Sequence, residues 1–293
     1  LEFTSVDELV NQRKPARWMR WSKRKQLLNQ FNGGFLLDGK VGRLSEQASF
    51  QSIVTTGGMG VGKSANLILP NLLTASNCSL VVTDTSGELF EQSAGALAAR
   101  GFEIQVFNLM DPTRSHRFNP LAAVRSYSDA EQIAHILVHT NEPFWDDGAK
   151  RLLRILIRTL KNTPQASTAS LVDVLYWLNK FDAHLPASEG GRQLDAFVAE
   201  NTLTDTGTFE DYRGFVTNAT DKILLSFVAT ASTALSMVGN GDIAQLLRGH
   251  DFDFDALKQR KIALFVMVRQ QDMAAFGFLL SLFYAQICDA LLK

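Results

Sequence analysis

The stretch "TTGGMGVGKSANLILP", residues 55–70, places four glycines directly before a lysine and a serine. Gly57, Gly62, Lys63 and Ser64 have the spacing G-x-x-x-x-G-K-S of a phosphate-binding loop, a motif that lies between a strand and a helix. The preceding "FQSIVTT" predicts a short strand over 50–56, and the following "ANLILPNLL" predicts a helix. The stretch therefore predicts an α/β domain built around a P-loop.

Each residue type in this loop has a physical role in holding a triphosphate. Glycines let the backbone curl so that successive N–H groups face a phosphate, and the helix that follows adds the positive end of its dipole. Lys63 is expected to reach the β- and γ-phosphates, and the Ser64 hydroxyl to complete the shell of a Mg²⁺ ion. Pro70 lacks a backbone donor and should end or kink the helix near Leu69. The predicted ligands are ATP and Mg²⁺, and the predicted nucleotide-binding residues are Gly57, Gly58, Gly60, Gly62, Lys63, Ser64 and Ala65.

The residues after the loop alternate between strand and helix patterns. "SLVVTD" (79–84) and "FEIQVFNL" (102–109) are apolar runs typical of strands, and "LFEQSAGALAARG" (89–101) between them is typical of a helix that ends at a glycine. Strand, helix and strand with short connections predict a parallel sheet with crossover helices.

A long helical block interrupts this pattern. Apolar residues recur at three-to-four spacing over five segments, and a branched apolar strand and a last helix follow them. We therefore predict a basic arm with a hairpin (1–48), a nucleotide-binding domain in two parts (49–125 and 239–293) and an all-α insertion (126–238). The helical segments are 128–140, 144–161, 168–181, 190–201 and 208–238, the strand is 261–268, and the last helix is 276–292.

Composition describes a globular chain with one unusual segment. The 293 residues are 46% hydrophobic and 20% charged, with a net charge of −1, so no field over the whole molecule attracts a polyanion. Basic residues crowd into 13–25 beside Trp18 and Trp21, which suits anionic lipid headgroups or nucleic-acid phosphates, and the alternative is a solvated arm. Cys78 and Cys288 have no ligand or redox spacing, so we expect two packed thiols in a reducing compartment.

Two short matches suggest a GTPase, but their spacing argues against one. Asp84 and Gly87 fit D-x-x-G, and Asn179 and Asp182 fit the guanine-reading N-K-x-D. The twenty residues from Lys63 to Asp84 leave no room for a switch threonine and an extra strand, and Asn179 follows a helical pattern rather than a strand tip. A GTPase-type switch stays open as an alternative, as does a non-hydrolysing assembly module.

Five segments in order resemble the type IV coupling proteins of conjugation and secretion systems, over about Phe50 to Lys293. They are the loop stretch, "LVVTDTSGELFEQSAGALAARGFEIQVFNL", "RFNPL", "PFWDDGAKRLLRILI" and "FDFDALKQRKIALFVMV". The resemblance implies a RecA-like P-loop NTPase sheet with an inserted all-α domain. It also implies a homo-hexameric ATPase that works with other secretion-system components at the cytoplasmic face of the bacterial inner membrane, where it brings DNA or secreted protein substrates to the channel.

The resemblance carries over to particular residues. Asp84 and Glu88 match the acidic ends of the family's "DPKGE" stretch, and residues 117–120 match its "RFNP" stretch. Thr85 and Ser86 replace the usual Pro-Lys, no Walker B carboxylates follow the last helix, and the family's N-terminal membrane helices are absent from the sequence, so contact with the inner membrane is expected through a missing segment. We expect Lys63 and Asp84 to be the catalytic residues, with Ser64 and Asp84 on the Mg²⁺ side; the alternative is that Asp84 caps the next turn. Without Walker B, this chain should bind ATP but hydrolyse it poorly.

Overall fold

The computed structural model describes residues 34–37, 42–49, 51, 53–58, 60–140, 142–181 and 193–293. The chain divides into two compact units, Leu1–Asn77 and Cys78–Lys293. The basic run at 13–25 lies outside the described residues, as do Asp38 and Gly39 of the predicted hairpin turn.

The first unit holds the predicted P-loop and a short antiparallel pairing. Leu36 and Arg43 form an antiparallel bridge, so the two arms that flank the predicted turn do pair. The Asn71 amide donates to the Leu36 carbonyl over 2.8 Å and accepts from the Leu36 N–H over 2.7 Å. Asn71 therefore acts toward Leu36 as a neighbouring strand would. The helices among the described residues of this unit are α3 (Glu46–Ser49), the π-helix η1 (Ser64–Ile68) and α4 (Leu69–Thr74).

The prediction of a strand over 50–56 is wrong for the described residues of that segment. Residues 51 and 53–56 have no regular secondary structure, and Val54 is 85% exposed. Branched residues favour strands because they fit a pleated, half-buried surface. Ile53 and Val54 are exposed and pair with no strand among the described residues. Their intrinsic preference for strands is therefore not enough to form one.

The predicted break near Leu69 is present as a change of helix type. The chain has π-helical hydrogen bonding from Ser64 to Ile68 and α-helical bonding from Leu69, with Pro70 in the first α-helical turn. Proline is tolerated in a first turn, where its missing N–H is not required. Pro70 therefore stands at the change from one hydrogen-bond pattern to the other.

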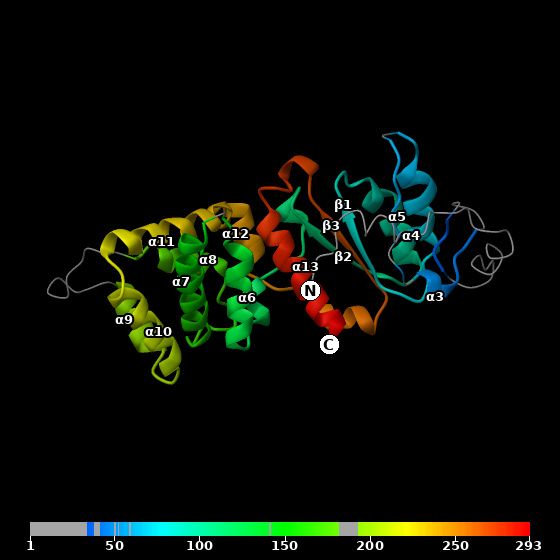
Figure 1. Ribbon diagram of the computed structural model, residues 1–293. Coiled ribbons are helices and arrows are strands. Elements are labelled where there is room, and N and C mark those ends of the chain that lie inside the picture. The colour runs from blue at the N-terminus through cyan, green and yellow to red at the C-terminus, as the bar shows by residue number, and fades with distance from the viewer. Residues whose placement is uncertain are drawn as a thin grey trace, which may run out of the picture. The chain divides into compact units, whose positions relative to one another are not determined.

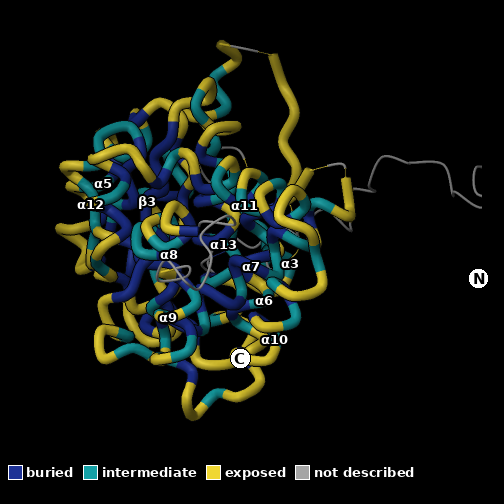
Figure 2. Tube along the Cα trace, turned by 90° about the vertical axis from the view of Figure 1, so that its left-hand side faces the viewer, coloured by how far each residue is buried: buried dark blue, intermediate teal, exposed yellow. Residues whose placement is uncertain are grey.

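The second unit contains a three-stranded parallel sheet, as the sequence predicts. β1 (Leu80–Asp84) and β2 (Glu103–Asn108) both pair with β3 (Ile262–Met267), in the order β1-β3-β2. All six residues of β3 are buried, in keeping with a central parallel strand that is covered on both faces. Figure 1 shows the three strands side by side, and Figure 2 shows β3 within the buried core.

The helical block between β2 and β3 differs from the prediction at its end. Segment 208–238 is two helices, because α10 ends at Thr217 and α11 begins at Asp221. Asn218 and Thr220 in the gap are residues that favour helix ends over helix interiors. Sheet structure returns at Ile262, within one residue of the predicted strand 261–268. The helices in the described part of this unit are α5 (Glu88–Ala99), α6 (Tyr127–Leu137), α7 (Pro143–Lys161), α8 (Leu171–Leu178), α9 (Gln193–Asn201), α10 (Thr206–Thr217), α11 (Asp221–Ala234), α12 (Gly241–Leu247) and α13 (Gly277–Leu292), with 3₁₀ turns η2 (Pro112–Arg114), η3 (Pro120–Ala123), η5 (Ser236–Gly239), η6 (Phe254–Lys258) and η7 (Gln270–Asp272).

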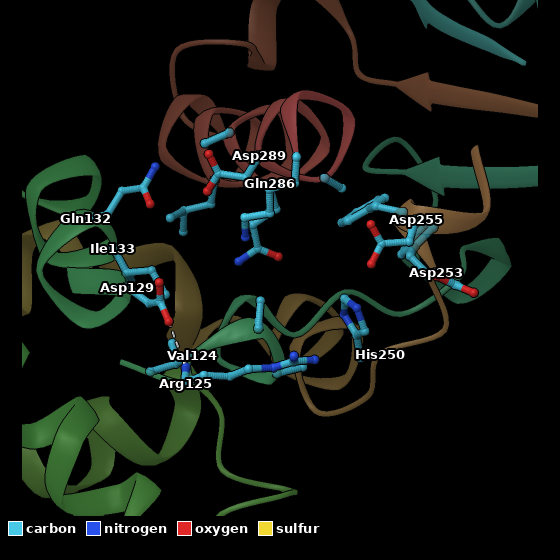
Figure 3. A pocket seen from close by; sticks show the side chains of 18 of the residues that line it. Val124, Arg125, Asp129, Gln132, Ile133, His250, Asp253, Asp255, Gln286 and Asp289 are labelled. Carbon is cyan, nitrogen blue, oxygen red and sulfur yellow. Dashed lines mark hydrogen bonds between the residues drawn. The ribbon is translucent and has the colours of Figure 1, made fainter. Parts of the chain in front are cut away.

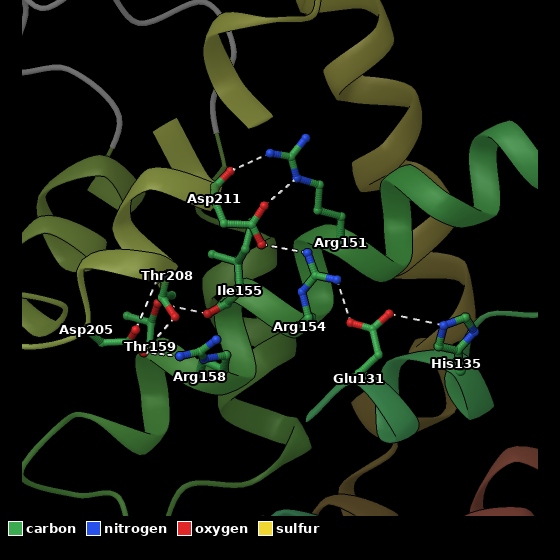
Figure 4. Close-up of polar contacts among 10 residues, drawn as sticks. All are labelled: Glu131, His135, Arg151, Arg154, Ile155, Arg158, Thr159, Asp205, Thr208 and Asp211. Carbon is green, nitrogen blue, oxygen red and sulfur yellow. Dashed lines mark hydrogen bonds and ion pairs between the residues drawn. The ribbon is translucent and has the colours of Figure 1, made fainter. Parts of the chain in front are cut away.

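The helical block is held together by a buried stripe on α7 and by an arginine ladder on the same helix (Figure 4). Arg151 and Arg154 both bind Asp211 of α10, over 2.7 and 2.6 Å. Arg154 also pairs with Glu131 of α6 over 2.5 Å, and Arg158 pairs with Asp205 over 2.7 Å. The ladder therefore joins α6, α7 and the α10 region through side chains that are mostly withdrawn from solvent.

Two further expectations concern the last helix and the cysteines. α13 packs Leu279, Leu282 and Phe283 into the core, as expected of a buried helix, and no helix among the described residues is both long and apolar enough to cross a membrane. Cys78 and Cys288 are free but exposed, so the prediction of packed thiols is wrong. Cys78 lies just before β1, and Cys288 lies on the outward face of α13.

Candidate nucleotide-binding site

The glycine-rich loop has backbone angles that only glycine adopts without strain. Gly60 and Gly62 have φ values of 74° and 81°, in the left-handed region that costs other residues free energy. A Cβ at Gly62 would also lie 2.5 Å from Nδ2 of the Asn66 side chain, which would have to turn aside. The positive φ of Gly62 therefore favours glycine at the second conserved position of the motif.

Lys63 points back into the loop. Its Nζ donates to the carbonyls of Gly57 and Gly58, over 2.7 Å each. The backbone N–H groups of Gly60 and Val61 make no hydrogen bond to another described residue. The loop therefore combines an ammonium group with free amide donors, which is the donor set that phosphate oxygens need.

The residues after the lysine fit the metal side of such a site. Ser64 and Ala65 are exposed at the start of η1, so the Ser64 hydroxyl is accessible to a ligand. The N–H of Asn66 bonds the Gly62 carbonyl over 2.7 Å, which fixes the helix start to the loop. π-helical turns are rare and frequently occur at functional sites.

Asp84 belongs to the second unit, at the end of β1, and is almost fully buried. Its Oδ1 accepts from the N–H of Gly87 over 2.9 Å, and its Oδ2 accepts from the N–H of Phe90 over 2.9 Å. Both carboxylate oxygens thus cap the first turn of α5, which is the alternative role considered for this residue. Its role at Mg²⁺ and that of Lys63 in catalysis stay predictions. Glu88 is exposed in the first turn of α5.

The "RFNP" residues connect three parts of the second unit. Arg117 and Asp251 form a two-pronged ion pair, with nitrogen–oxygen distances of 2.8 and 3.1 Å. Phe118 is fully buried among other aromatic rings. Asn119 accepts from the N–H of Leu121 and donates to the Ala169 carbonyl over 2.8 Å. These residues hold the exit of β2 against the helical block, so their chemistry is structural.

Sequence reasoning missed one polar residue at the carboxyl edge of the sheet. Arg269 lies two residues after the end of β3, its side chain is 58% exposed, and its nearest ion pair is with Asp272 at 4.0 Å. Ligands of parallel sheets bind outside the carboxyl ends of the strands. A basic residue directly after an apolar strand was the available signal for this candidate.

The second GTPase match does not have the geometry of a base reader. Asn179 caps the carboxyl end of helix α8 and does not project from a strand. Asp182 lies outside the described residues. Within the described ranges no group of three histidine, cysteine, aspartate or glutamate residues is arranged to hold a metal ion.

Sequence comparison places the chain among conjugation proteins. The model of a family described as "Type IV secretory system Conjugative DNA transfer" matches residues 6–293. Protein VirD4 of Agrobacterium fabrum is 22% identical over 244 residues, which cover 78% of this chain and 34% of VirD4. Protein VirD4 of Rhizobium radiobacter is 24% identical over 245 residues, which cover 78% of this chain and 33% of the relative. The chain thus spans about a third of the length of these curated relatives.

Structural comparison finds the same fold in a plasmid coupling protein. TrwB in complex with the non-hydrolysable ATP analogue ADPNP has a TM-score of 0.61 at 17% identity, over 96% of this chain and 64% of TrwB. TrwB in complex with ADP and Mg²⁺ has a TM-score of 0.61 at 17% identity, over 94% of this chain and 60% of TrwB. The chain therefore has a mixed α/β fold with a parallel sheet, similar to that of TrwB.

Proposed function

Since this chain belongs to the type IV secretory system conjugative DNA transfer family, we propose that it is the ATP-binding part of a coupling protein that brings DNA or protein substrates to a secretion channel. The P-loop is the observation that carries the proposal. It combines left-handed Gly60 and Gly62, free amide donors and the Lys63 ammonium group within one short segment.

The residues of the loop divide the work of holding a nucleotide. The backbone amides around Gly60 and the Lys63 ammonium group would bind the phosphate oxygens. To do so, Lys63 would give up its hydrogen bonds to the Gly57 and Gly58 carbonyls and donate to the phosphate instead. The Ser64 hydroxyl supplies a ligand to Mg²⁺, which when bound neutralises part of the phosphate charge. The solved complexes of TrwB with ADPNP, and with ADP and Mg²⁺, support this choice of ligands.

Hydrolysis needs more than this loop. A carboxylate must hold the hydration shell of Mg²⁺, and another must orient the attacking water. Asp84 is our candidate for the Mg²⁺ side, although both of its oxygens already cap α5. We therefore expect ATP binding with slow turnover from this chain alone.

We also propose a domain architecture, an oligomeric state and a cellular location for the whole protein, on the basis of its family. Residues 49–125 and 239–293 form a RecA-like nucleotide-binding domain, and 126–238 form an inserted all-α domain. The family supports a homo-hexamer at the cytoplasmic face of the inner membrane, anchored through a further segment and working with other secretion components. The basic arm at 13–25 suits either lipid headgroups or DNA.

A second candidate function is a nucleotide switch without steady turnover. TrwB has also been solved with the GTP analogue GDPNP, in a complex with a TM-score of 0.61 to this chain. The position of Asn179 at a helix end disfavours guanine selection.

Two measurements separate these functions. Titration of the chain with ATP and with GTP should favour ATP, and the rate of phosphate release with Mg²⁺ should be low. Strong selection of GTP would support the switch. A fast, Mg²⁺-dependent rate of phosphate release that disappears in Lys63→Ala would contradict the expectation of slow ATP turnover by this chain.

A further inference from the structure

Two short segments of the first unit, residues 34–37 and 42–44, pair with each other, and we call them the hairpin segments. The Leu37 N–H donates to the Gly42 carbonyl over 2.8 Å, in addition to the antiparallel bridge at Leu36. Leu36 is only 2% exposed, so its backbone groups must find partners within the protein. Those partners come from the helix that follows the nucleotide loop.

Asn71 of α4 supplies both partners. Its Oδ1 accepts from the Leu36 N–H over 2.7 Å, and its Nδ2 donates to the Leu36 carbonyl over 2.8 Å. Nδ2 also donates to the Leu67 carbonyl of η1 over 2.8 Å. A primary amide has two N–H donors and one acceptor oxygen, so this side chain uses both of its donors and its acceptor. We call these three hydrogen bonds the Asn71 clasp.

The Asn71 clasp reaches the helical turn that begins directly after Lys63. Leu67 lies in η1, whose first residue is Ser64, and the Asn66 N–H bonds the Gly62 carbonyl over 2.7 Å. π-helical turns are rare and often lie at functional sites. Here one carbonyl of such a turn accepts from a side chain that is itself bonded to the hairpin segments. The helix start that presents the Ser64 hydroxyl is therefore joined to the hairpin segments through one residue.

We propose that Asn71 is a positioning residue for the nucleotide loop, and that the Asn71 clasp couples ATP binding to the hairpin segments. This inference rests on the ATP binding proposed above. Coupling between two sites is reciprocal. Since the clasp favours the loop conformation that binds ATP, bound ATP stabilises the clasp by the same factor, and the exchange rate of the Leu36 amide reports this change.

Hydrogen exchange of the intact chain without nucleotide tests the Asn71 clasp from both ends. Asn71→Ala removes the clasp, and Gly34→Ala disturbs the hairpin segments, because a Cβ at Gly34 would lie 2.0 Å from the Leu44 backbone oxygen. Each variant should speed exchange of the Asn66 amide by about threefold to tenfold. Alanine is a better helix former than asparagine, so a role of Asn71 confined to α4 predicts slower exchange. Unchanged or slower exchange of the Asn66 amide in either variant overturns the coupling.

Titration with a non-hydrolysable ATP analogue and Mg²⁺ tests the effect on the site. Asn71→Ala and Gly34→Ala should each weaken binding by about threefold to tenfold. The double variant should weaken binding no further than the stronger single variant, because both changes break one connection. In the unaltered chain, saturating analogue should slow exchange of the Leu36 amide by about the same factor, and in Asn71→Ala it should not. Additive weakening in the double variant, or no protection of Leu36 at saturation, overturns the inference.

Two exposed residues outside the clasp provide control variants, which are Glu46→Gln on α3 and Asp289→Asn in the cavity between α6 and α13 (Figure 3). Both should leave Asn66 exchange and the affinity for the analogue unchanged, and equal weakening by either control overturns the role of Asn71. Thermal melts will show which variants are folded, and protection of the Leu36 amide by the analogue is measured without any variant. An unaltered chain that does not bind the analogue contradicts the proposed function, and the coupling with it, whereas binding without protection of Leu36 overturns only the coupling.

Discussion

Gly148 in α7 should be intolerant of the smallest possible enlargement. A Cβ at this position would lie 2.2 Å from two carbon atoms of the Phe227 ring on α11, far inside van der Waals contact. Phe227 is 7% exposed, and its ring packs on Trp145 and Phe215 with centroids 5.8 Å away in each case. The ring cannot move aside without disturbing these neighbours.

The expected magnitude follows from two opposing effects. Alanine inside a helix is better than glycine by about 1 kcal/mol, and overpacking a well-packed core costs about 1–3 kcal/mol. With only 2.2 Å between the added Cβ and the Phe227 ring, a shift of the ring by a few tenths of an ångström would not relieve the clash. We therefore expect an overpacking cost at or above the upper end of that range. Gly148→Ala should therefore reduce the free energy of unfolding by about 2 kcal/mol.

Urea unfolding, followed by tryptophan fluorescence, measures this change, with Trp145 as a reporter beside the ring. Gly95→Ala on α5 is the control, because no atom lies within 4 Å of the added Cβ, and it should stabilise by about 0.5–1 kcal/mol. Phe227→Ala removes the obstacle, so Gly148→Ala should cost little in that background. An equal cost in both backgrounds would refute the steric explanation.

Three other predictions concern single polar groups. Asp84→Asn should destabilise the chain by about 1–2 kcal/mol, measured by thermal unfolding, because an amide cannot accept at both oxygens; an unchanged melt contradicts its capping role. Asn71→Ala should speed hydrogen exchange of the Leu36 amide about tenfold, and unchanged exchange would show that this bond does not protect it. Burial lowers the pKa of His250, so the unfolded chain binds more protons and stability falls as the pH drops below about 6.5; His250→Phe should lessen this fall, and an identical pH profile would contradict it.

The sequence predicted the sheet well because its strands are local features. β1, β2 and β3 are short apolar runs, and each lies within a residue or so of its predicted range. The order β1-β3-β2 could not be predicted, because it depends on where the long helical crossover returns. The segment 50–56 shows the opposite case, since strand propensity needs a partner that the described residues do not provide.

The candidate site was predictable to the extent that it is a motif. Gly57 to Ser64 could be read directly, and the positive φ values of Gly60 and Gly62 agree with the expected loop. The capping bonds of Asp84 depend on how β1 meets α5, so two roles were open from sequence alone. Gly148 and Asn71 depend on contacts with residues far along the chain, which no local pattern reveals.

Binding of a nucleoside triphosphate at the loop around Gly60 and Lys63 is the function proposed for this segment. Its most direct test is titration of the intact chain with a fluorescent, non-hydrolysable ATP analogue and Mg²⁺, beside Lys63→Ala and the control Lys258→Ala, which alters an exposed lysine outside the loop. Binding should be saturable, and Lys63→Ala should weaken it by at least about tenfold while Lys258→Ala leaves it intact. Equal affinity of the Lys63→Ala variant and the unaltered chain would contradict this role of the loop.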